Sequence, residues 1–336
     1  MKKKLSTLFL ALAVLLVPIA VVACGGNVEG TFTENGIVYE VANHSATVIG
    51  AEEGATEATI STEIKGATVD RIAEEAFKDN TILTKLAFVN GDYSLVISSN
   101  AFYNSNIETI ENLPADTTLS SKALFGLKNL KSISVQGEGE LSVENGALVE
   151  NGDGYKALIL LPAGVAPQTN FEDGTYTLTG YSQVNAGAGA YNQFITDIVI
   201  EEDVYRLNTD AFSYINLNSV TVMSDDTFID SLAFTSHKDL KVYINATSSN
   251  FSGFMRLSKN YVYGHEWLVH PIGCTDSSQH MHGEIDGQVP ASYESIDWSL
   301  SGEDGFTVET YAYGSKVTIK GTLPRYMQET YEEAVV

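Results

Sequence analysis

Hydrophobic and polar positions recur along this chain with a spacing typical of a repeat protein. An Ala-Phe pair is followed, five or six residues later, by an aliphatic residue that opens a β-rich stretch. The pattern occurs at Ala76 and Phe77, Ala101 and Phe102, Ala123 and Phe125, Ala211 and Phe212, and Ala233 and Phe234. Within the two runs the Phe residues are 25, 23 and 22 residues apart. This period predicts a solenoid, because such a short unit buries its apolar face only against stacked copies.

Each predicted unit combines a short helical turn with a short strand. The Ala residue allows the backbones of neighbouring copies to approach, and the Phe ring fills the space beneath the turn. Strands of successive copies are expected to pair in parallel, about 4.8 Å apart. The copies would then share one continuous hydrophobic core.

The first unit, Ile72-Ala73-Glu74-Glu75-Ala76-Phe77 with Leu83 and Leu86, carries the motif Ile-x-x-x-Ala-Phe…Leu-x-x-Ile/Val. This motif resembles the leucine-rich repeats of the BspA-like family of bacterial surface proteins. Residues 32–39 are similar to the strand that precedes those repeats, and residues 143–149 with 158–164 to the family's inserted hairpin. The resemblance covers residues 31–245. It implies an α+β to mainly β leucine-rich-repeat solenoid with short strands and short helical turns, repeats near 60–135 and 195–245, and a hairpin near 140–165.

The chain departs from the family pattern in three places. The cysteine usual in the middle of the repeats is absent, the third copy reads Ala123-Leu124-Phe125, and residues 165–200 show little repetition. Family members are displayed on cells and are implicated in adhesion or in binding other macromolecules. The resemblance therefore implies a non-catalytic binding or adhesion module for an extracellular or envelope protein or glycan.

The N-terminus has the features of an export signal. Three Lys residues at positions 2–4 precede an apolar run over residues 8–20, and Val21-Val22-Ala23-Cys24-Gly25 resembles the lipobox of bacterial lipoproteins. We expect a signal peptide over residues 1–23, an acylated Cys24, and a lipidated tether over residues 24–30 that holds the protein at the cell membrane or outer surface. An ordinary transmembrane anchor is the alternative. Seven residues separate Cys24 from Phe32, so the tether reaches at most about 25 Å.

Charge narrows the range of partners. The chain has 19 basic and 43 acidic residues, a net charge of −24. Removal of residues 1–23 takes away three Lys and no acid, which leaves 16 basic and 43 acidic residues, a net charge of −27. Such a surface repels phosphate, so we expect no nucleic-acid partner. No Gly-x-Ser-x-Gly or comparable catalytic motif occurs, and we expect no enzymatic activity.

The C-terminal segment, residues 246–336, differs in composition from the repeats. Residues 293–322 alternate apolar and polar side chains, which predicts a β-hairpin or a larger β structure. Two interpretations remain open: a cap that shields the last repeat, and an immunoglobulin-like module, to which residues 295–299 and 314–319 bear a faint resemblance.

A histidine-rich stretch within this segment suggests a second function. His265, His270, Cys274, His280 and His282 supply imidazole and thiolate, the ligands that zinc prefers. The protein would then be a metal-binding envelope lipoprotein. The alternative is that these are scattered structural residues, because their spacing matches no zinc-finger pattern. No other cofactor is expected.

Overall fold

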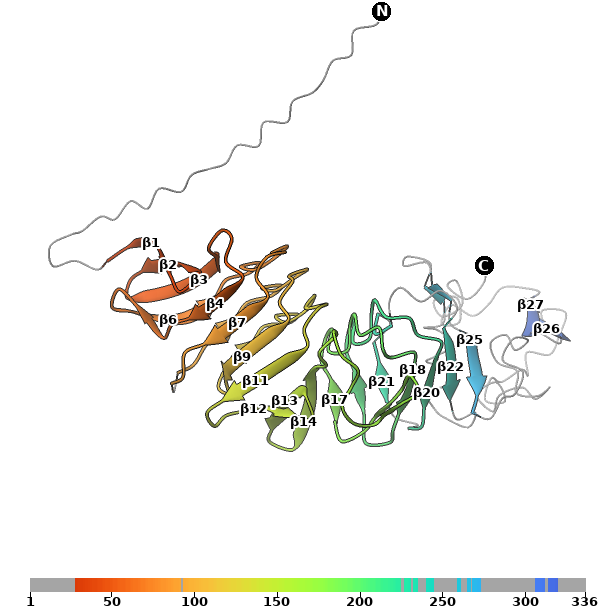
Figure 1. Ribbon diagram of the computed structural model, residues 1–336. Helices are drawn as coiled ribbons and strands as arrows, with labels where there is room; N and C mark the ends of the chain where they lie inside the picture. The colour runs from red at the N-terminus through yellow and green to blue at the C-terminus, as the bar shows by residue number, and fades with distance from the viewer. Residues whose placement is uncertain are drawn as a thin grey trace, which may run out of the picture.

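The computed structural model describes residues 28–91, 93–224, 227–230, 232–234 and 240–244, and the strands within 259–260, 265–266, 268–272, 306–311 and 314–319. The described chain is an elongated stack of β-coils (Figure 1). Each coil consists of a long strand, a short strand and a tight turn. Successive coils pair in parallel, as in Lys85↔Thr109 and Asp197↔Ser219, so the sequence prediction of stacked parallel strands is confirmed.

The coils form two runs, each with two sheets. The sheet that contains the short strands of the coils is called the short-strand side, and the sheet that contains their longer strands is called the long-strand side. In the first run, the short-strand side contains β1 (Gly30–Glu34), β2 (Ile37–Ala42), β3 (Ser45–Ala51), β6 (Ala67–Ile72), β8 (Val96–Ile97) and β10 (Thr118–Leu119) in this order, with β5 (Glu63–Ile64) beside β6. Its long-strand side contains β11 (Ser132–Gln136), β9 (Thr109–Pro114), β7 (Lys85–Phe88) and β4 (Glu57–Ile60).

The second run repeats this arrangement. Its short-strand side is β12 (Leu141–Glu144), β13 (Ala147–Gly152), β14 (Tyr155–Leu160), β17 (Gln183–Val184), β19 (Arg206–Leu207) and β21 (Phe228–Ile229). Its long-strand side is β15 (Phe171–Glu172), β16 (Thr175–Leu178), β18 (Asp197–Ile200), β20 (Ser219–Val222), β22 (Lys241–Ile244) and β25 (Leu268–Pro271). Two separate pairs are β23 (Lys259–Asn260) with β24 (His265–Glu266), and β26 (Phe306–Tyr311) with β27 (Gly314–Ile319).

One C-terminal strand extends the repeat sheet beyond the end predicted from the sequence. β25 pairs in parallel with β22, from Lys241↔Leu268 to Ile244↔Pro271. The long-strand side therefore continues past residue 245, where the sequence pattern stops. β26 and β27 form the antiparallel hairpin expected from the alternation in residues 293–322.

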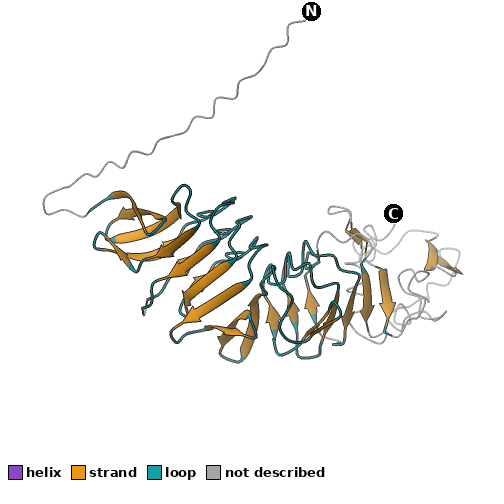
Figure 2. Ribbon diagram, in the orientation of Figure 1, coloured by secondary structure: helices purple, strands orange, loops and turns teal. Residues whose placement is uncertain are grey.

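The turns are not helical, which corrects the predicted α+β component. No helix occurs among the described residues (Figure 2). Five of the turns within the described residues contain two residues with positive φ four positions apart: Glu75 and Asp79, Asn100 and Asn104, Lys122 and Gly126, Gly187 and Tyr191, and Asp210 and Tyr214. A left-handed residue ends a right-handed helical turn, and two of them within five residues exclude one. The fold is a mainly β solenoid.

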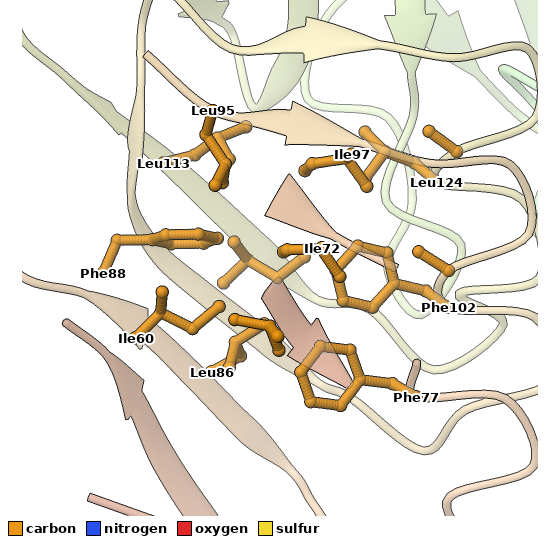
Figure 3. Close-up of a cluster of buried hydrophobic side chains, with 14 of the residues drawn as sticks. Ile60, Ile72, Phe77, Leu86, Phe88, Leu95, Ile97, Phe102, Leu113 and Leu124 are labelled. Atoms are coloured by element: carbon orange, nitrogen blue, oxygen red, sulfur yellow. The ribbon is translucent and has the colours of Figure 1, made fainter. Parts of the chain in front are cut away.

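Alternation of side chains along the strands builds the core. In β7, β18, β20 and β22 the second and fourth residues point inward and are buried. Phe rings from the turns close the core: the Phe77 and Phe102 ring centroids are 5.3 Å apart with nearly parallel planes, and Phe212 and Phe234 stack in the same way at 6.3 Å. Figure 3 shows Phe77 and Phe102 beside the inward aliphatic side chains.

The inserted hairpin separates the two cores. Successive residues of β14 point to opposite sides, because side chains alternate along a strand. Ala157 and Ile159 belong to the core of the first run, whereas Leu158 belongs to that of the second run. The hairpin is therefore a wall shared by both runs.

Buried tyrosines predict an alkaline limit to stability. Burial raises the pKa of Tyr93 to about 12, and it also raises the pKa values of Tyr39, Tyr176 and Tyr191. Because the folded pKa values lie above the ordinary value of 10.0, the tyrosine contribution to the free energy of unfolding is complete below pH 10 and is lost as the pH rises through about 12.

Denaturant unfolding across this pH range, followed by circular dichroism, tests this expectation. Tyr93→Phe removes one of the titrating groups and should flatten the decline. A wild-type free energy of unfolding that stays constant above pH 10 would contradict it.

Candidate binding surface

The repeat turns place the predicted core residues inside the solenoid. Phe77, Ala101, Phe102, Ala211, Phe212, Ala233 and Phe234 are buried, and Ala76 is half-buried. Backbone hydrogen bonds tie one turn to the next: the Phe77 N–H donates to the Ala101 carbonyl, and the Phe212 N–H to the Ala233 carbonyl. These residues hold the stack together and leave the binding surface to other positions.

Phe125 differs from the other repeat phenylalanines. Because one residue is inserted in Ala123-Leu124-Phe125, Leu124 joins the core of the first run, and the Phe125 ring stacks on Tyr103 at 6.0 Å. Its other two ring-to-ring contacts are in the second run, with ring centroids 5.5 Å from Tyr191 and 6.2 Å from Tyr214. Phe125 therefore joins the two runs.

A further turn, at residues 185–192, lies next to this junction. The Gly189 N–H donates to the Ala211 carbonyl and the Tyr191 N–H to the Ser213 carbonyl, as in the other stacked turns. The sequence interpretation of residues 165–200 as poorly repetitive is thus wrong for this part. Gly189 occupies the position of the missing Phe, because its N–H makes the hydrogen bond that the Phe N–H makes in other turns. A Cβ there would lie 2.3 Å from the Phe212 ring, so no larger residue fits.

Two surfaces of the repeats face solvent, and they differ in chemistry. On the long-strand side, polar groups pair with each other: Lys85 lies 2.9 Å from Glu111, and Asp197 accepts hydrogen bonds from Thr196 and Ser219. On the short-strand side of the second run, large side chains are exposed. Tyr205 is 49 % exposed and Phe228 is 54 % exposed. The long-strand groups satisfy one another, whereas these aromatic side chains have much of their surface in water.

Tyr205, Arg206 and Phe228 are here called the aromatic patch: the Arg206 and Phe228 side chains are in contact, and Tyr205 is next to Arg206 in the chain. Arg206 and Phe228 are directly paired on β19 and β21, and the Phe228 N–H donates to the Tyr205 carbonyl at 2.8 Å. The Arg206 guanidinium carbon lies 5.0 Å from the centre of the Phe228 ring, and Nε donates to Asn208. The corresponding row of the first run, Arg71, Val96 and Thr118, has no aromatic residue.

The sequence did not single out this patch, because its two aromatic residues do not occupy one repeat position. Phe228 pairs with Arg206, so the repeat counterpart of Phe228 is Arg206 and not Tyr205. The Ala-Phe pattern marks buried positions and does not indicate which outward side chains are aromatic.

The residues that form the coils match the model of a known protein family. The model of the BspA type leucine rich repeat region matches residues 55–148 and 178–250, in six copies. The chain belongs to the BspA-type leucine-rich repeat family. The family match includes the turn at residues 185–192 and the whole aromatic patch.

Solved structures of leucine-rich proteins are similar to this chain. A leucine rich cell surface protein from Faecalibacterium prausnitzii is 12 % identical, with 74 % of this chain and 96 % of that chain covered and a TM-score of 0.30. A leucine-rich repeat protein from Bacteroides ovatus is 18 % identical, with 63 % and 70 % covered and a TM-score of 0.30. No curated protein matches the chain.

The other predicted site residues lie largely outside the described residues. Cys24, Cys274, His280 and His282 are not described. His265 lies in β24 and His270 in β25, whose side chains are likewise not described. Among the described side chains, no group of three or more His, Cys, Asp or Glu is arranged to hold a metal. In the same part of the chain no helix has the length and apolarity to cross a membrane.

Proposed function

We propose that this BspA-type protein is a lipid-anchored, extracytoplasmic binding module that contacts a protein partner through the aromatic patch. The observation that supports this proposal is the pair of exposed aromatic residues, Tyr205 and Phe228. The Arg206 guanidinium carbon lies 5.0 Å from the centre of the Phe228 ring. Aromatic and Arg side chains dominate the binding energy of protein interfaces. The family and the cell-surface description of the Faecalibacterium relative support a place outside the cytoplasm.

The geometry of the patch favours tight binding. β19, which carries Arg206, pairs in parallel with β17 and β21, and β21, which carries Phe228, pairs with β19, so little backbone entropy is lost when a partner docks. Arg206 is a cation on a chain of net charge −24, and it would pair with a carboxylate of the partner. Phe228, beside it, would enter an apolar pocket.

The lipid anchor is part of the proposal. Two or three acyl chains on Cys24 would hold the protein at a membrane, since each buried CH₂ contributes about 0.8 kcal/mol. The tether of residues 24–30 is short, so the partner must lie within the envelope or close to it. A neighbouring envelope protein therefore fits better than a distant host receptor.

Site-specific crosslinking on cells tests the patch. A photoreactive amino acid in place of Tyr205 is expected to give a discrete protein adduct, and Phe228→Ala in the same chain should reduce its yield about tenfold or more, because such aromatic contacts contribute about 2 kcal/mol. Phe194 is the matched control, since it is 46 % exposed but lies in the turn after residue 192 and outside the patch.

The same photoreactive group at position 194 should give no such adduct. Equal adducts from both positions, or a yield that is insensitive to Phe228→Ala, would contradict the assignment of the patch.

A further inference from the structure

The junction of the two runs contains a cleft that neither the repeats nor the aromatic patch explain. A cavity of about 410 Å³ lies between the turn after β10 and the turns after β17 and β19. A second cavity, of about 350 Å³, lies between β10 and the start of the inserted hairpin. Both are lined by Leu119 and Asn185, so they are neighbours. Together they are called the junction cleft.

The cleft arises because the sheets are interrupted there. β10 is the edge strand of the first short-strand sheet. The next sheet begins with the hairpin β12–β14 (Figure 1). Residues 161–164 fill part of the space, since the Leu161 N–H donates to the Ala188 carbonyl and the Gly164 N–H to the Leu130 carbonyl. The space between the turn at 120–125 and the turn at 185–187 stays open.

The walls of the cleft are held in place from both runs. Lys122 Nζ lies 2.6 Å from Asp210 Oδ2, across a sequence separation of 88 residues. The Phe125 ring packs so closely on Gly187 that a Cβ there would lie 2.4 Å from it, and Gly187 also has a positive φ of 77°. A cleft with fixed walls binds a ligand at a low cost in conformational entropy.

Polar groups with unused hydrogen-bonding capacity line the cleft, and Asn185 shows this by comparison with its repeat counterpart Asn208. The Asn208 side chain donates to the Val184 carbonyl and accepts from Arg206. The side-chain amide of Asn185 has no hydrogen-bond partner among the described residues. The hydroxyls of Ser120, Ser121 and Thr209 line the same cavity, and they too are unpaired within the described chain.

The charge of the lining selects among ligands. Lys122, the one cation that lines either described cavity, is neutralised by Asp210. Asp116, Glu140 and Glu150 line the second cavity, which is therefore anionic. The cleft repels phosphates, sulfates and uronic acids. Carboxylates are strong acceptors for hydroxyl donors, and Leu119, Leu124, Ile159 and Leu160 give the cleft an apolar floor.

We infer that the junction cleft binds a neutral oligosaccharide. Sugar hydroxyls donate and accept at once, which matches a lining of amide, hydroxyl and carboxylate groups. The C–H faces of a sugar ring suit the aliphatic floor. The combined cavities lie within the size range of small-molecule sites, about 300–1,000 Å³. This site is distinct from the aromatic patch, so the protein has one surface for a protein and one for a glycan.

Titration calorimetry on the detergent-solubilised full-length protein tests the ligand class. Neutral hexose and N-acetylhexosamine oligomers are the probes, and uronic acid oligomers of equal length are the comparison. We expect saturable binding of at least one neutral series and at least about tenfold weaker binding of the uronic acids. Binding of neither series, or tighter binding of uronic acids, would overturn the inference.

Matched variants locate the binding. Ser121→Trp places a large ring in the cleft and is expected to weaken binding more than tenfold, while Asn185→Ala should weaken it about threefold to tenfold through one lost hydrogen bond. Ser99→Trp is the control. The Ser98 and Ser120 carbonyls accept equivalent turn hydrogen bonds, so Ser99 is the repeat counterpart of Ser121, one coil away from the cleft. Equal affinities of Ser99→Trp and Ser121→Trp, with Asn185→Ala unchanged, would refute the site. Phe228→Ala should leave glycan binding unchanged even if no protein partner exists.

Discussion

Replacement of Phe102 by Ala is expected to lower the free energy of unfolding by about 3–5 kcal/mol. The Phe102 side chain is fully buried and stacks on Phe77, with ring planes 1° apart. Its removal leaves a cavity that neighbouring residues cannot close, because hydrogen bonds fix the turns on both sides, as from the Phe77 N–H to the Ala101 carbonyl. The loss also weakens two coil interfaces, since a solenoid gains its stability from contacts between neighbours.

Denaturant unfolding measures this effect, with Phe194→Ala as the control. Phe194 is 46 % exposed, so its truncation should change the free energy of unfolding by no more than about 0.5 kcal/mol. If the two variants unfolded at the same denaturant concentration, Phe102 would have no part in a shared core.

Replacement of Cys24 by Ser is expected to remove the protein from the membrane fraction entirely. A serine at this position offers no thiol for acylation, and without acyl chains the proposed tether has nothing to partition into lipid. Cell fractionation followed by intact mass measurement of the exported protein would show both the location and the absence of the lipid.

Cys274→Ser is the matched control and should leave the protein lipidated and membrane-bound. Full membrane retention of Cys24→Ser would instead support the alternative of an uncleaved apolar anchor over residues 8–20. Retention in both variants with no lipid on wild-type protein would contradict the lipoprotein proposal directly.

The repeat architecture was predictable from the sequence because its strongest determinant is local. Each Ala-Phe pair and its following aliphatic lie within one coil, so their spacing reports the period without knowledge of distant contacts. The inserted hairpin was also predictable: residues 143–149 and 158–164 overlap β12, β13 and β14. The period and the hairpin together fix the order of the elements.

Two sequence predictions were wrong, the helical turns and the lack of a repeat near residues 185–192, because residues there act through their backbone conformation. The short helical turns predicted for the repeats are absent, because positive φ at pairs such as Asn100 and Asn104 excludes them. The turn at 185–192 was missed because Gly189 has no side chain to continue the Phe pattern. It contributes by making room for Phe212.

The junction cleft could not be predicted from the sequence at all. Lys122 and Asp210 meet across 88 residues, and a single inserted position at Leu124 turns Phe125 toward the second run. Neither contact has a local signature. The aromatic patch could not be predicted either, since Arg206 and Phe228 meet only through the pairing of β19 with β21, and their exposure depends on the stacked coils.

The interruption of the sheets also determines how the molecule bears force. A pull between a membrane-held N-terminus and a partner gripping β19 and β21 passes through every coil interface in series. Within each run, ladders share that load among several hydrogen bonds. At the junction the ladders stop, and the load falls on the apolar contacts of the hairpin with the first core, on Lys122 with Asp210, on the Phe125 stack and on residues 161–164. Under tension, this joint would rupture first and leave both halves folded.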